Sequence, residues 1–354
     1  MNNKKVVLGM SGGVDSSVSA LLLKEQGYEV IGVFMRNWHE TDDEGHCTAE
    51  QDYTDVRRVA DFLGIPYYSV DLSKQYMDEV FQLFLDEYKK GRTPNPDVLC
   101  NKEIKFGHFK KIAKDIEADY VATGHYAGTT CINGKTYLTR ARDENKDQTY
   151  FLNQLKESQI ADVIFPLSEI TKPEVRKLAE KYNIPTATKK DSTGVCFIGE
   201  RNFKKFLSEY VPMKPGKIMS LDGRVVGEHE GVFFYTIGQR KGMGLGGAGT
   251  GEPYYVVKKD VINNILYVNQ GECPELFSKE LIANDFNFIT DRAEEGETLL
   301  VRIRHRQPLV PAKLNYISDS SIKLSFEEPL RAVTPGQYAV VYRDRICLGG
   351  GVIE

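Results

Sequence analysis

The chain has 354 residues, 41% of them hydrophobic, which is too long for one ordinary domain and enough for two or three packed cores. No stretch reaches the apolar length of a membrane span and no signal peptide leads the chain, so we expect a cytoplasmic protein with no membrane partner. The formal net charge is −4, whereas RNA binding normally needs a basic surface, so any RNA-binding surface must be local.

The first predicted elements are a strand at residues 6–8, a glycine-rich turn at 9–17 with the sequence G-M-S-G-G-V-D-S-S, and a helix. Such a turn offers backbone N–H groups and a positive helix dipole to a phosphate, and its serines add hydroxyl donors. Asp15 can either cap the helix or hold Mg²⁺. The turn lacks the lysine of a P-loop GTPase and the spacing of a dinucleotide-binding loop, so both classes fit poorly.

Strand and helix signals alternate through the first half of the chain. The predicted strands are at residues 28–35, 67–72 and 119–123, and the predicted helices at 50–63, 73–88 and 103–116. This alternation predicts an α/β fold with a doubly wound, mostly parallel sheet. Ligands of such sheets bind beyond the carboxyl ends of the strands, where the glycine turn, Met35 and Gly124-His125 should meet.

Shorter strand signals dominate the second half. Asn133-Gly134 predicts a hairpin between two β-rich runs, and Thr171 with Glu174 forms a capping box that predicts a helix start. Later segments are short strands separated by glycine and proline turns. We therefore predict an N-terminal PP-loop domain at 1–205, a small central β-rich domain at 206–280 and a C-terminal β-barrel at 281–354.

Basic residues gather in local groups. Arg302, Arg304 and Arg306 alternate along a predicted strand at 298–306, which would place them on one face suited to phosphate. Lysines recur along the segment 101–114 and again between residues 204 and 241. Since charge runs are usually solvated surface, these groups alone leave RNA binding open.

Two of the six cysteines stand out by their surroundings. Cys100 follows a proline-rich loop and is expected to open a helix, where the dipole favours a thiolate. Cys196 lies in a glycine-flanked loop after two lysines. A single cysteine is more often a small buried hydrophobe, so the residues alone do not decide. No C-x-x-C occurs, and the spacing of His39, His46 and Cys47 fits no common site, so we predict no resident metal centre.

Several long segments resemble one family. The S-G-G-V-D-S turn is similar to the PP-loop of ATP pyrophosphatases, and the segments 91–101, 193–199 and 236–242 resemble bacterial tRNA-specific 2-thiouridylases. The resemblance implies an ATP-dependent tRNA sulfurtransferase. Such an enzyme adenylates the C2 oxygen of the wobble uridine and replaces it with sulfur from a cysteine persulfide.

The resemblance also implies site residues and partners. Cys196 would carry the persulfide and Cys100 would release the sulfur, ending in a Cys100–Cys196 disulfide, with Asp97 as general acid or base unless it only caps the following helix. The residues implied for ATP, which brings Mg²⁺, are Gly9, Met10, Ser11, Gly12, Gly13, Val14, Asp15, Ser16, Met35 and Gly124. Those implied for tRNA are Asn95, Pro96, Asp97, His125, Lys146, Asp147, Gln148, Arg304, His305 and Gln337. The implied partners are tRNAs for lysine, glutamate and glutamine, and a cysteine desulfurase or sulfur-relay protein.

Two rival functions remain open from the residues. A PP-loop amidotransferase or ligase, such as an NAD or GMP synthetase, explains the glycine turn but gives the two loop cysteines no role. An ATP-gated RNA-binding module predicts RNA binding without release of pyrophosphate.

Overall fold

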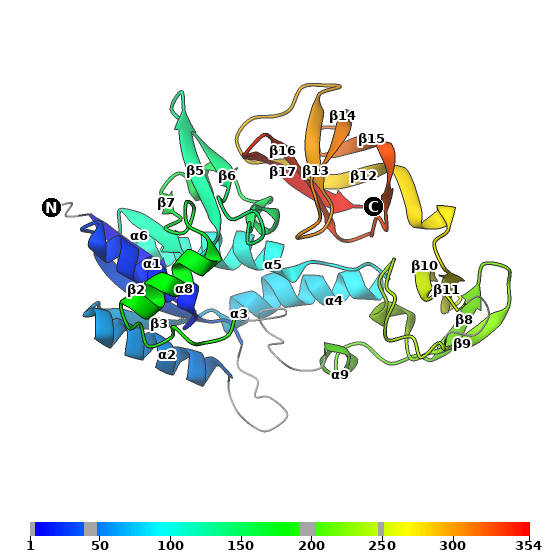
Figure 1. Ribbon diagram of the computed structural model, residues 1–354, viewed down its shortest axis with the longest axis horizontal. Helices are drawn as coiled ribbons and strands as arrows, with labels where there is room; N and C mark the ends of the chain where they lie inside the picture. The colour runs from blue at the N-terminus through cyan, green and yellow to red at the C-terminus, as the bar shows by residue number, and fades with distance from the viewer. Residues whose placement is uncertain (1–3, 39–47, 192–202, 247–250) are drawn as a thin grey trace.

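The computed structural model describes residues 4–38, 48–191, 203–246 and 251–354. Figure 1 shows an α/β body at the N-terminus, a small β body in the middle of the chain and a β-barrel at the C-terminus. The predicted fold class is confirmed. No helix within the described ranges is long and apolar enough to cross a membrane.

The N-terminal body is built on a parallel sheet of five strands in the order β3-β2-β1-β4-β7. The strands are β1 (Lys5–Gly9), β2 (Glu29–Arg36), β3 (Tyr67–Asp71), β4 (Tyr120–Thr123) and β7 (Val163–Ile164). Strand β1 is apolar throughout its middle because helices cover both faces of the sheet. Its neighbours β2 and β4 follow it in opposite directions across the sheet, so the topological switch point lies at the carboxyl end of β1.

Two groups of helices cover the sheet. One face packs against α1 (Val14–Glu25), α2 (Thr48–Leu63) and α8 (Lys172–Lys181). The other face packs against α3 (Ser73–Tyr76), η1 (Met77–Phe81), α4 (Gln82–Lys89), α5 (Pro96–Leu99), η2 (Cys100–His108) and α6 (Phe109–Asp115). The last three form one continuous helical segment, which begins seven residues before the predicted start at residue 103, and its middle has the wider π-helical turn.

A hairpin links the N-terminal body to the barrel. Strands β5 (Ala127–Ile132) and β6 (Lys135–Arg140) are joined by Asn133 and Gly134, whose φ angles of 51° and 79° suit the tight turn predicted there. Strand β6 then pairs with the last strand of the chain, so the hairpin extends the barrel sheet to eight strands. Local sequence pattern did not predict this pairing.

The remaining elements form the central sheet and the barrel. The central sheet has the order β10-β11-β8-β9, with β8 (Gly216–Ser220), β9 (Val225–His229), β10 (Tyr254–Asp260) and β11 (Ile265–Gln270). The barrel strands are β12 (Phe277–Phe288), β13 (Thr298–Arg302), β14 (Val310–Ser318), β15 (Ser321–Arg331), β16 (Tyr338–Arg343) and β17 (Ile346–Ile353), and pairing of β12 with β17 closes it. Short helices α7 (Glu157–Ile160), α9 (Phe203–Ser208), η3 (Thr149–Leu152), η4 (Val232–Phe234) and η5 (Pro274–Leu276) connect these parts.

The prediction that Arg302, Arg304 and Arg306 share one face of a strand is wrong. Strand β13 ends at Arg302, which is only 5% exposed, and Arg306 has a left-handed φ of 67°. The three arginines therefore do not alternate along one strand.

The three bodies meet at the loop before α5. Thr93 donates its backbone N–H to Pro335 O of the barrel (2.9 Å), and its hydroxyl lies 3.4 Å from that of Thr236 in the central region. Gly336 has a φ of 90°, and a Cβ there would come within 2.9 Å of Thr93 N. The barrel backbone thus lies directly on this loop and positions the start of the helix that carries Asp97 and Cys100.

Candidate active site

The glycine turn between β1 and α1 has the geometry of a phosphate site. Gly13 is the N-cap of α1 and no side chain caps it, so the first N–H groups of the helix are open toward the turn. The hydroxyls of Ser16 and Ser17 both donate to Gly13 O, at 3.1 and 2.8 Å. These two hydroxyls therefore close the turn on itself, and the backbone supplies the open donors.

Gly12 is the position in this turn where a side chain fits least. Its φ is 74°, and a Cβ would lie 2.5 Å from Asp52 O of α2. We expect Gly12→Ala to lower the unfolding free energy by about 1–3 kcal/mol and to abolish ATP binding, because the turn must open to relieve the clash. Urea denaturation and calorimetric titration with ATP measure the two effects.

Gly13→Ala is the matched control for that prediction. Gly13 has a φ of −88°, which any residue adopts, and its Cβ would be 3.4 Å from the Ser11 hydroxyl. We expect a stability close to that of the unchanged protein. An equal loss of stability in both variants would show that the positive φ and the close contact at Gly12 do not cause the loss in Gly12→Ala.

The parallel sheet brings the predicted nucleotide residues to one edge. Gly124 directly follows β4, and a Cβ there would lie 3.0 Å from Ser16 N, so its backbone lies against the first turn of α1. Met35 is at the end of β2, and its methyl group would lie 3.0 Å from a Cβ on Gly9. Segments that are far apart in sequence therefore frame the same space beyond the strand ends.

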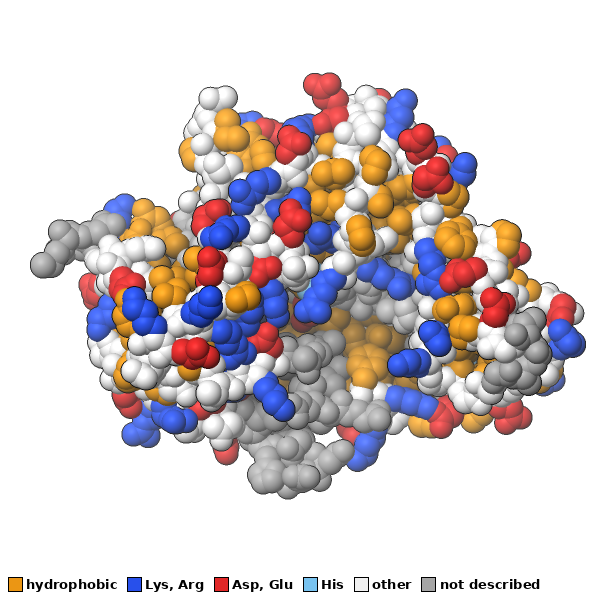
Figure 2. All heavy atoms as spheres, viewed as in Figure 1, with side chains coloured by type: hydrophobic (Ala, Val, Ile, Leu, Met, Phe, Trp, Pro, Cys, Tyr) orange, Lys and Arg blue, Asp and Glu red, His pale blue; other side chains and the backbone are white. Residues whose placement is uncertain are grey.

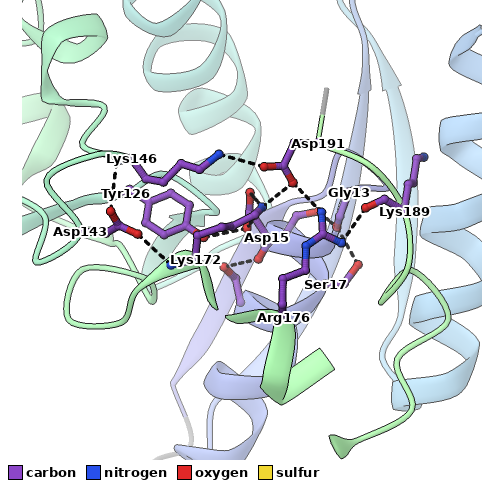
Figure 3. Close-up of polar contacts among 12 residues, drawn as sticks. Gly13, Asp15, Ser17, Tyr126, Asp143, Lys146, Lys172, Arg176, Lys189 and Asp191 are labelled. Carbon is purple, nitrogen blue, oxygen red and sulfur yellow. Dashed lines mark hydrogen bonds and ion pairs between the residues drawn. The ribbon is translucent and has the colours of Figure 1, made fainter. Parts of the chain in front are cut away.

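A charged cluster beside the turn was missed by the sequence analysis (Figure 3). The Lys172 ammonium lies 2.7 Å from both carboxylate oxygens of Asp15 and 2.8 Å from Asp191. Lys146 and Arg176 also contact Asp191, at 2.8 and 2.6 Å. Burial would raise the pKa of Asp191, but the hydrogen bonds from Lys146 and Lys172 outweigh it and hold the pKa far below its usual range. Asp15 is thus an ion-pair partner and does not cap α1.

The segment 146–148, which is predicted to contact tRNA, also makes polar contacts within the protein. Lys146 faces Asp191, and Gln148 accepts a hydrogen bond from the backbone N–H of Tyr126 (2.9 Å). Asp147 is 1% exposed, accepts one hydrogen bond from the Thr149 hydroxyl, which lies 3.0 and 2.8 Å from its two oxygens, and lies 3.3 Å from the Arg302 guanidinium. The buried Asp147 carboxylate joins the N-terminal body to the barrel, whereas Lys146 and Gln148 stay partly exposed.

Two of the predicted catalytic residues, Asp97 and Cys100, lie on one helical segment, and the predicted tRNA-binding residue His125 lies at the strand end facing it. Asn95 is the N-cap of α5, so Asp97 in the first turn is not the cap. Cys100 is 1% exposed, one turn further along the same segment. Burial raises the pKa of Asp97, although Lys105 opposes this, and burial together with Lys105 lowers the pKa of His125 well below its usual value. A protonated acid and a neutral imidazole are therefore favoured here.

His125 touches the helix of Cys100. Its Nδ1 lies 2.8 Å from the Thr123 hydroxyl, and its ring is 5.9 Å from that of Phe106. The ring is thus held between the end of β4 and the π-helical turn.

Barrel residues frame the start of α5 from the other side. Gln337 donates to Thr93 O (2.8 Å), and the ring of His305 lies 4.5 Å from that of Phe151. Phe151 O in turn accepts from the Asn101 amide (3.0 Å). One Arg304 nitrogen is used internally, since it donates to the carbonyl oxygens of Ile237 and Ala332 and to the Thr334 hydroxyl.

Lys and Arg side chains gather around one hollow on the face drawn in Figure 2. Figure 2 shows a hollow below the barrel, between the N-terminal body and the central body, with Lys and Arg side chains around it and apolar side chains in its floor. Within the described ranges, no group of three or more Cys, His, Asp and Glu is arranged to hold a metal.

Family models match most of the chain. Residues 4–200 match a tRNA methyl transferase HUP domain, 204–270 a tRNA methyl transferase PRC-barrel domain and 278–353 an aminomethyltransferase β-barrel domain. The tRNA-specific 2-thiouridylase MnmA 1 of Geobacillus kaustophilus is 56% identical over 100% of this chain and 96% of its own length. That of Alkaliphilus oremlandii is 54% identical over 99% of this chain and 97% of its own length. The chain belongs to the family of tRNA-specific 2-thiouridylases.

Membership confirms the predicted family and the prediction that the chain is an enzyme. Two of the matched domain descriptions speak of methyl transfer, but the thiouridylases match the whole chain at more than half identity and so decide the family. Solved structures are only distantly similar. A 4-thiouridine synthetase bound to RNA and ATP has a TM-score of 0.36 at 18% identity, covering 59% of this chain and 50% of its own. An NMN synthetase from Francisella tularensis has a TM-score of 0.34 at 16% identity, covering 54% and 67%. Scores this low support no conclusion.

Some predicted residues of this 2-thiouridylase lie outside the described ranges. Cys196 is one of them, as are His39, His46 and Cys47. The last described residue before Cys196 is Asp191 of the charged cluster.

Proposed function

We propose that this 2-thiouridylase adenylates the C2 oxygen of a wobble uridine with ATP and replaces that oxygen with sulfur from a cysteine persulfide. One observation carries the proposal: Gly124 at the end of β4 lies against the open phosphate turn, and the next residue, His125, packs on the helical segment that carries Asp97 and Cys100. The products are 2-thiouridine, AMP and pyrophosphate. Adenylation is needed because AMP is a far better leaving group than hydroxide.

ATP fits the turn. The uncapped N-terminus of α1 supplies backbone donors for phosphate, and Gly9, Met35 and Gly124 border the adjoining space at the strand ends. Asp15 is the carboxylate nearest the turn. Mg²⁺ in proteins commonly takes one or two carboxylates together with substrate phosphates, so the donor set suits a cation that arrives with ATP and would be completed by its phosphates.

Sulfur transfer assigns different tasks to the two cysteines. The terminal sulfur of a persulfide on Cys196 attacks C2 and displaces AMP, which leaves the uridine linked to Cys196 through an S–S bond. The Cys100 thiolate then attacks the Cys196 sulfur. The electron pair of the broken S–S bond goes to the sulfur on C2, and a Cys100–Cys196 disulfide remains.

In this proposal Asp97 and His125 lie beside the uracil ring. A carboxyl with a raised pKa can give a proton to the base and take one back, and the neutral His125 packs without adding charge. Asn95, Pro96, His305 and Gln337 surround the same region, where they would hold the flipped nucleotide and its neighbours, and Arg304 keeps part of its guanidinium for tRNA.

We expect Asp97→Asn to cut thiolation by about 10²–10⁴-fold and to make the protein more stable at neutral pH. The folded state holds the Asp97 proton at pH values where the unfolded chain has lost it, so stability falls as the pH rises from the usual carboxyl pKa through the folded value. The amide avoids that loss. Urea denaturation at pH 4 and pH 8, with the exposed Asp78→Asn as control, measures the difference. A variant that is less stable than the unchanged protein at pH 8 would contradict a raised pKa for Asp97.

The proposed partners are tRNAs with a wobble uridine, such as those for lysine, glutamate and glutamine, and a cysteine desulfurase or relay protein in the cytoplasm. Activation can be tested without the sulfur donor. Incubation with ATP, Mg²⁺ and unmodified tRNA for glutamate should release pyrophosphate and leave an equal amount of AMP attached to the tRNA. A tRNA with adenosine at the wobble position has no C2 oxygen and should release none. Methyl transfer from S-adenosylmethionine without pyrophosphate release would contradict the proposal.

A further inference from the structure

Lys172 holds two carboxylates at once beside the phosphate turn (Figure 3). Its ammonium lies 2.7 Å from both oxygens of Asp15 and 2.8 Å from Asp191, and its side chain is 11% exposed. Asp15 is the second residue of α1, whose uncapped N-terminus forms the phosphate turn. Lys172 therefore contacts a residue of the helix start whose backbone N–H groups would bind the phosphates.

The backbone fixes this lysine in place. Lys172 is the first residue of α8, where Thr171 and Glu174 form the predicted capping box. Its own N–H donates to Asp143 (2.8 Å), and α8 packs along α1. The side chain thus leaves a rigid helix start and is aimed across at Asp15.

Asp15 and Asp191, the two carboxylates that contact Lys172, differ in the number of cations around them. Three cations, Lys146, Lys172 and Arg176, converge on Asp191, whereas within the described ranges Lys172 is the cation that contacts Asp15. Asp191 would keep two cationic partners if Lys172 moved away. Asp15 would keep only the Tyr126 hydroxyl, 2.9 Å away, and would be open to a divalent cation.

We propose that Lys172 is a phosphate-binding residue that exchanges Asp15 for the β- and γ-phosphates when ATP binds. This rests on the proposed function, because it assigns a part of the ATP site. Without nucleotide the ammonium neutralises Asp15; with nucleotide it turns to the phosphates and leaves Asp15 to the cation that accompanies them. A charged hydrogen bond to phosphate replaces one to a carboxylate, so the exchange keeps every buried charge paired.

The competing explanation is that Lys172 only clamps Asp15 in place. A clamp would affect every nucleotide to the same degree. A ligand of the β- and γ-phosphates affects ATP and leaves AMP, which lacks those groups, nearly unchanged. The ratio of the two affinities separates these roles without any measurement of thiolation.

The experiment is calorimetric titration of the full-length protein with Mg²⁺·ATP and with AMP. Lys172→Met keeps the length of the side chain and removes its charge. We expect it to weaken ATP binding by about 10- to 100-fold, which is the loss expected for one charged hydrogen bond. AMP binding should weaken by less than about twofold. Lys172→Arg should retain most of the preference for ATP. Lys146→Met removes a charge that faces Asp191 alone and should change the ratio much less. Lys177→Met, exposed on the same helix, tests folding.

The outcomes are distinguishable. An unchanged ratio of ATP to AMP affinity in Lys172→Met, with ATP binding intact in the unchanged protein, would overturn this inference and leave the proposed function standing. An unchanged protein that binds no ATP would overturn both. A selective loss for ATP in Lys172→Met, absent from Lys146→Met, is the expected result.

Discussion

Replacing Cys100 by Ser is expected to stop 2-thiouridine formation, by at least about 10³-fold, while release of pyrophosphate continues. A serine hydroxyl cannot attack a disulfide sulfur at neutral pH, so the uridine stays joined to Cys196 after AMP has left. The substitution is small and the position is 1% exposed, so the change removes the thiol with little change of shape. In a single turnover without added thiol, tRNA should migrate with the protein on a denaturing gel.

Two controls make this result specific to Cys100. Cys131→Ser changes an exposed cysteine of β5 and should thiolate at the normal rate. Dithiothreitol added to the Cys100→Ser adduct should release free tRNA containing 2-thiouridine, because an external thiol can take the place of Cys100. Product at the normal rate in Cys100→Ser without added thiol would show that Cys196 acts without this partner.

Asp147→Ala is expected to lower the unfolding free energy by about 3–5 kcal/mol. The carboxylate lies in the interior, 3.3 Å from the guanidinium of Arg302, and its removal leaves that cation buried without its counter-charge. The hydrogen bonds from Thr149 and from the Ala141 N–H are lost as well. Since these groups join the N-terminal body to the barrel, we expect the barrel to separate at a lower urea concentration than in the unchanged protein. Fluorescence and circular dichroism measure this transition.

An exposed pair provides the matched comparison. Arg292 and Asp319 lie 3.6 Å apart on the surface, and Asp319→Ala should cost less than about 1 kcal/mol. The double variant Asp147→Leu with Arg302→Met should recover part of the loss, because it removes both buried charges together. Equal losses in Asp147→Ala and Asp319→Ala would mean that Asp147 is not the buried link described here.

Local patterns predicted the parts of the fold that local physics decides. The glycine turn, the hairpin at Asn133-Gly134 and the capping box at Thr171 each depend on residues a few positions apart, and each is present where predicted. The alternation of strands and helices gave the α/β class for the same reason. The long family segments added the reaction, which no periodicity contains.

Long-range packing accounts for what was missed. The pairing of β6 with β17 joins residues about 200 positions apart, and nothing in either strand announces its partner. The alternation of Arg302, Arg304 and Arg306 suggested an exposed strand face. Arg302 instead pairs with Asp147 in the interior, and the strand ends at this residue. Lys172 was visible only as part of a helix start. Its approach to Asp15 depends on how α8 lies against α1, which the sequence does not show.

Formation of 2-thiouridine in tRNA tests the central claim most directly. The protein is incubated with ATP, Mg²⁺, cysteine, a cysteine desulfurase and unmodified tRNA for glutamate, and the digested nucleosides are analysed by mass spectrometry. We expect 2-thiouridine that disappears when ATP is omitted. Pyrophosphate released from ATP with no 2-thiouridine, even with sulfide supplied in place of the desulfurase, would contradict sulfur transfer as the activity of this site.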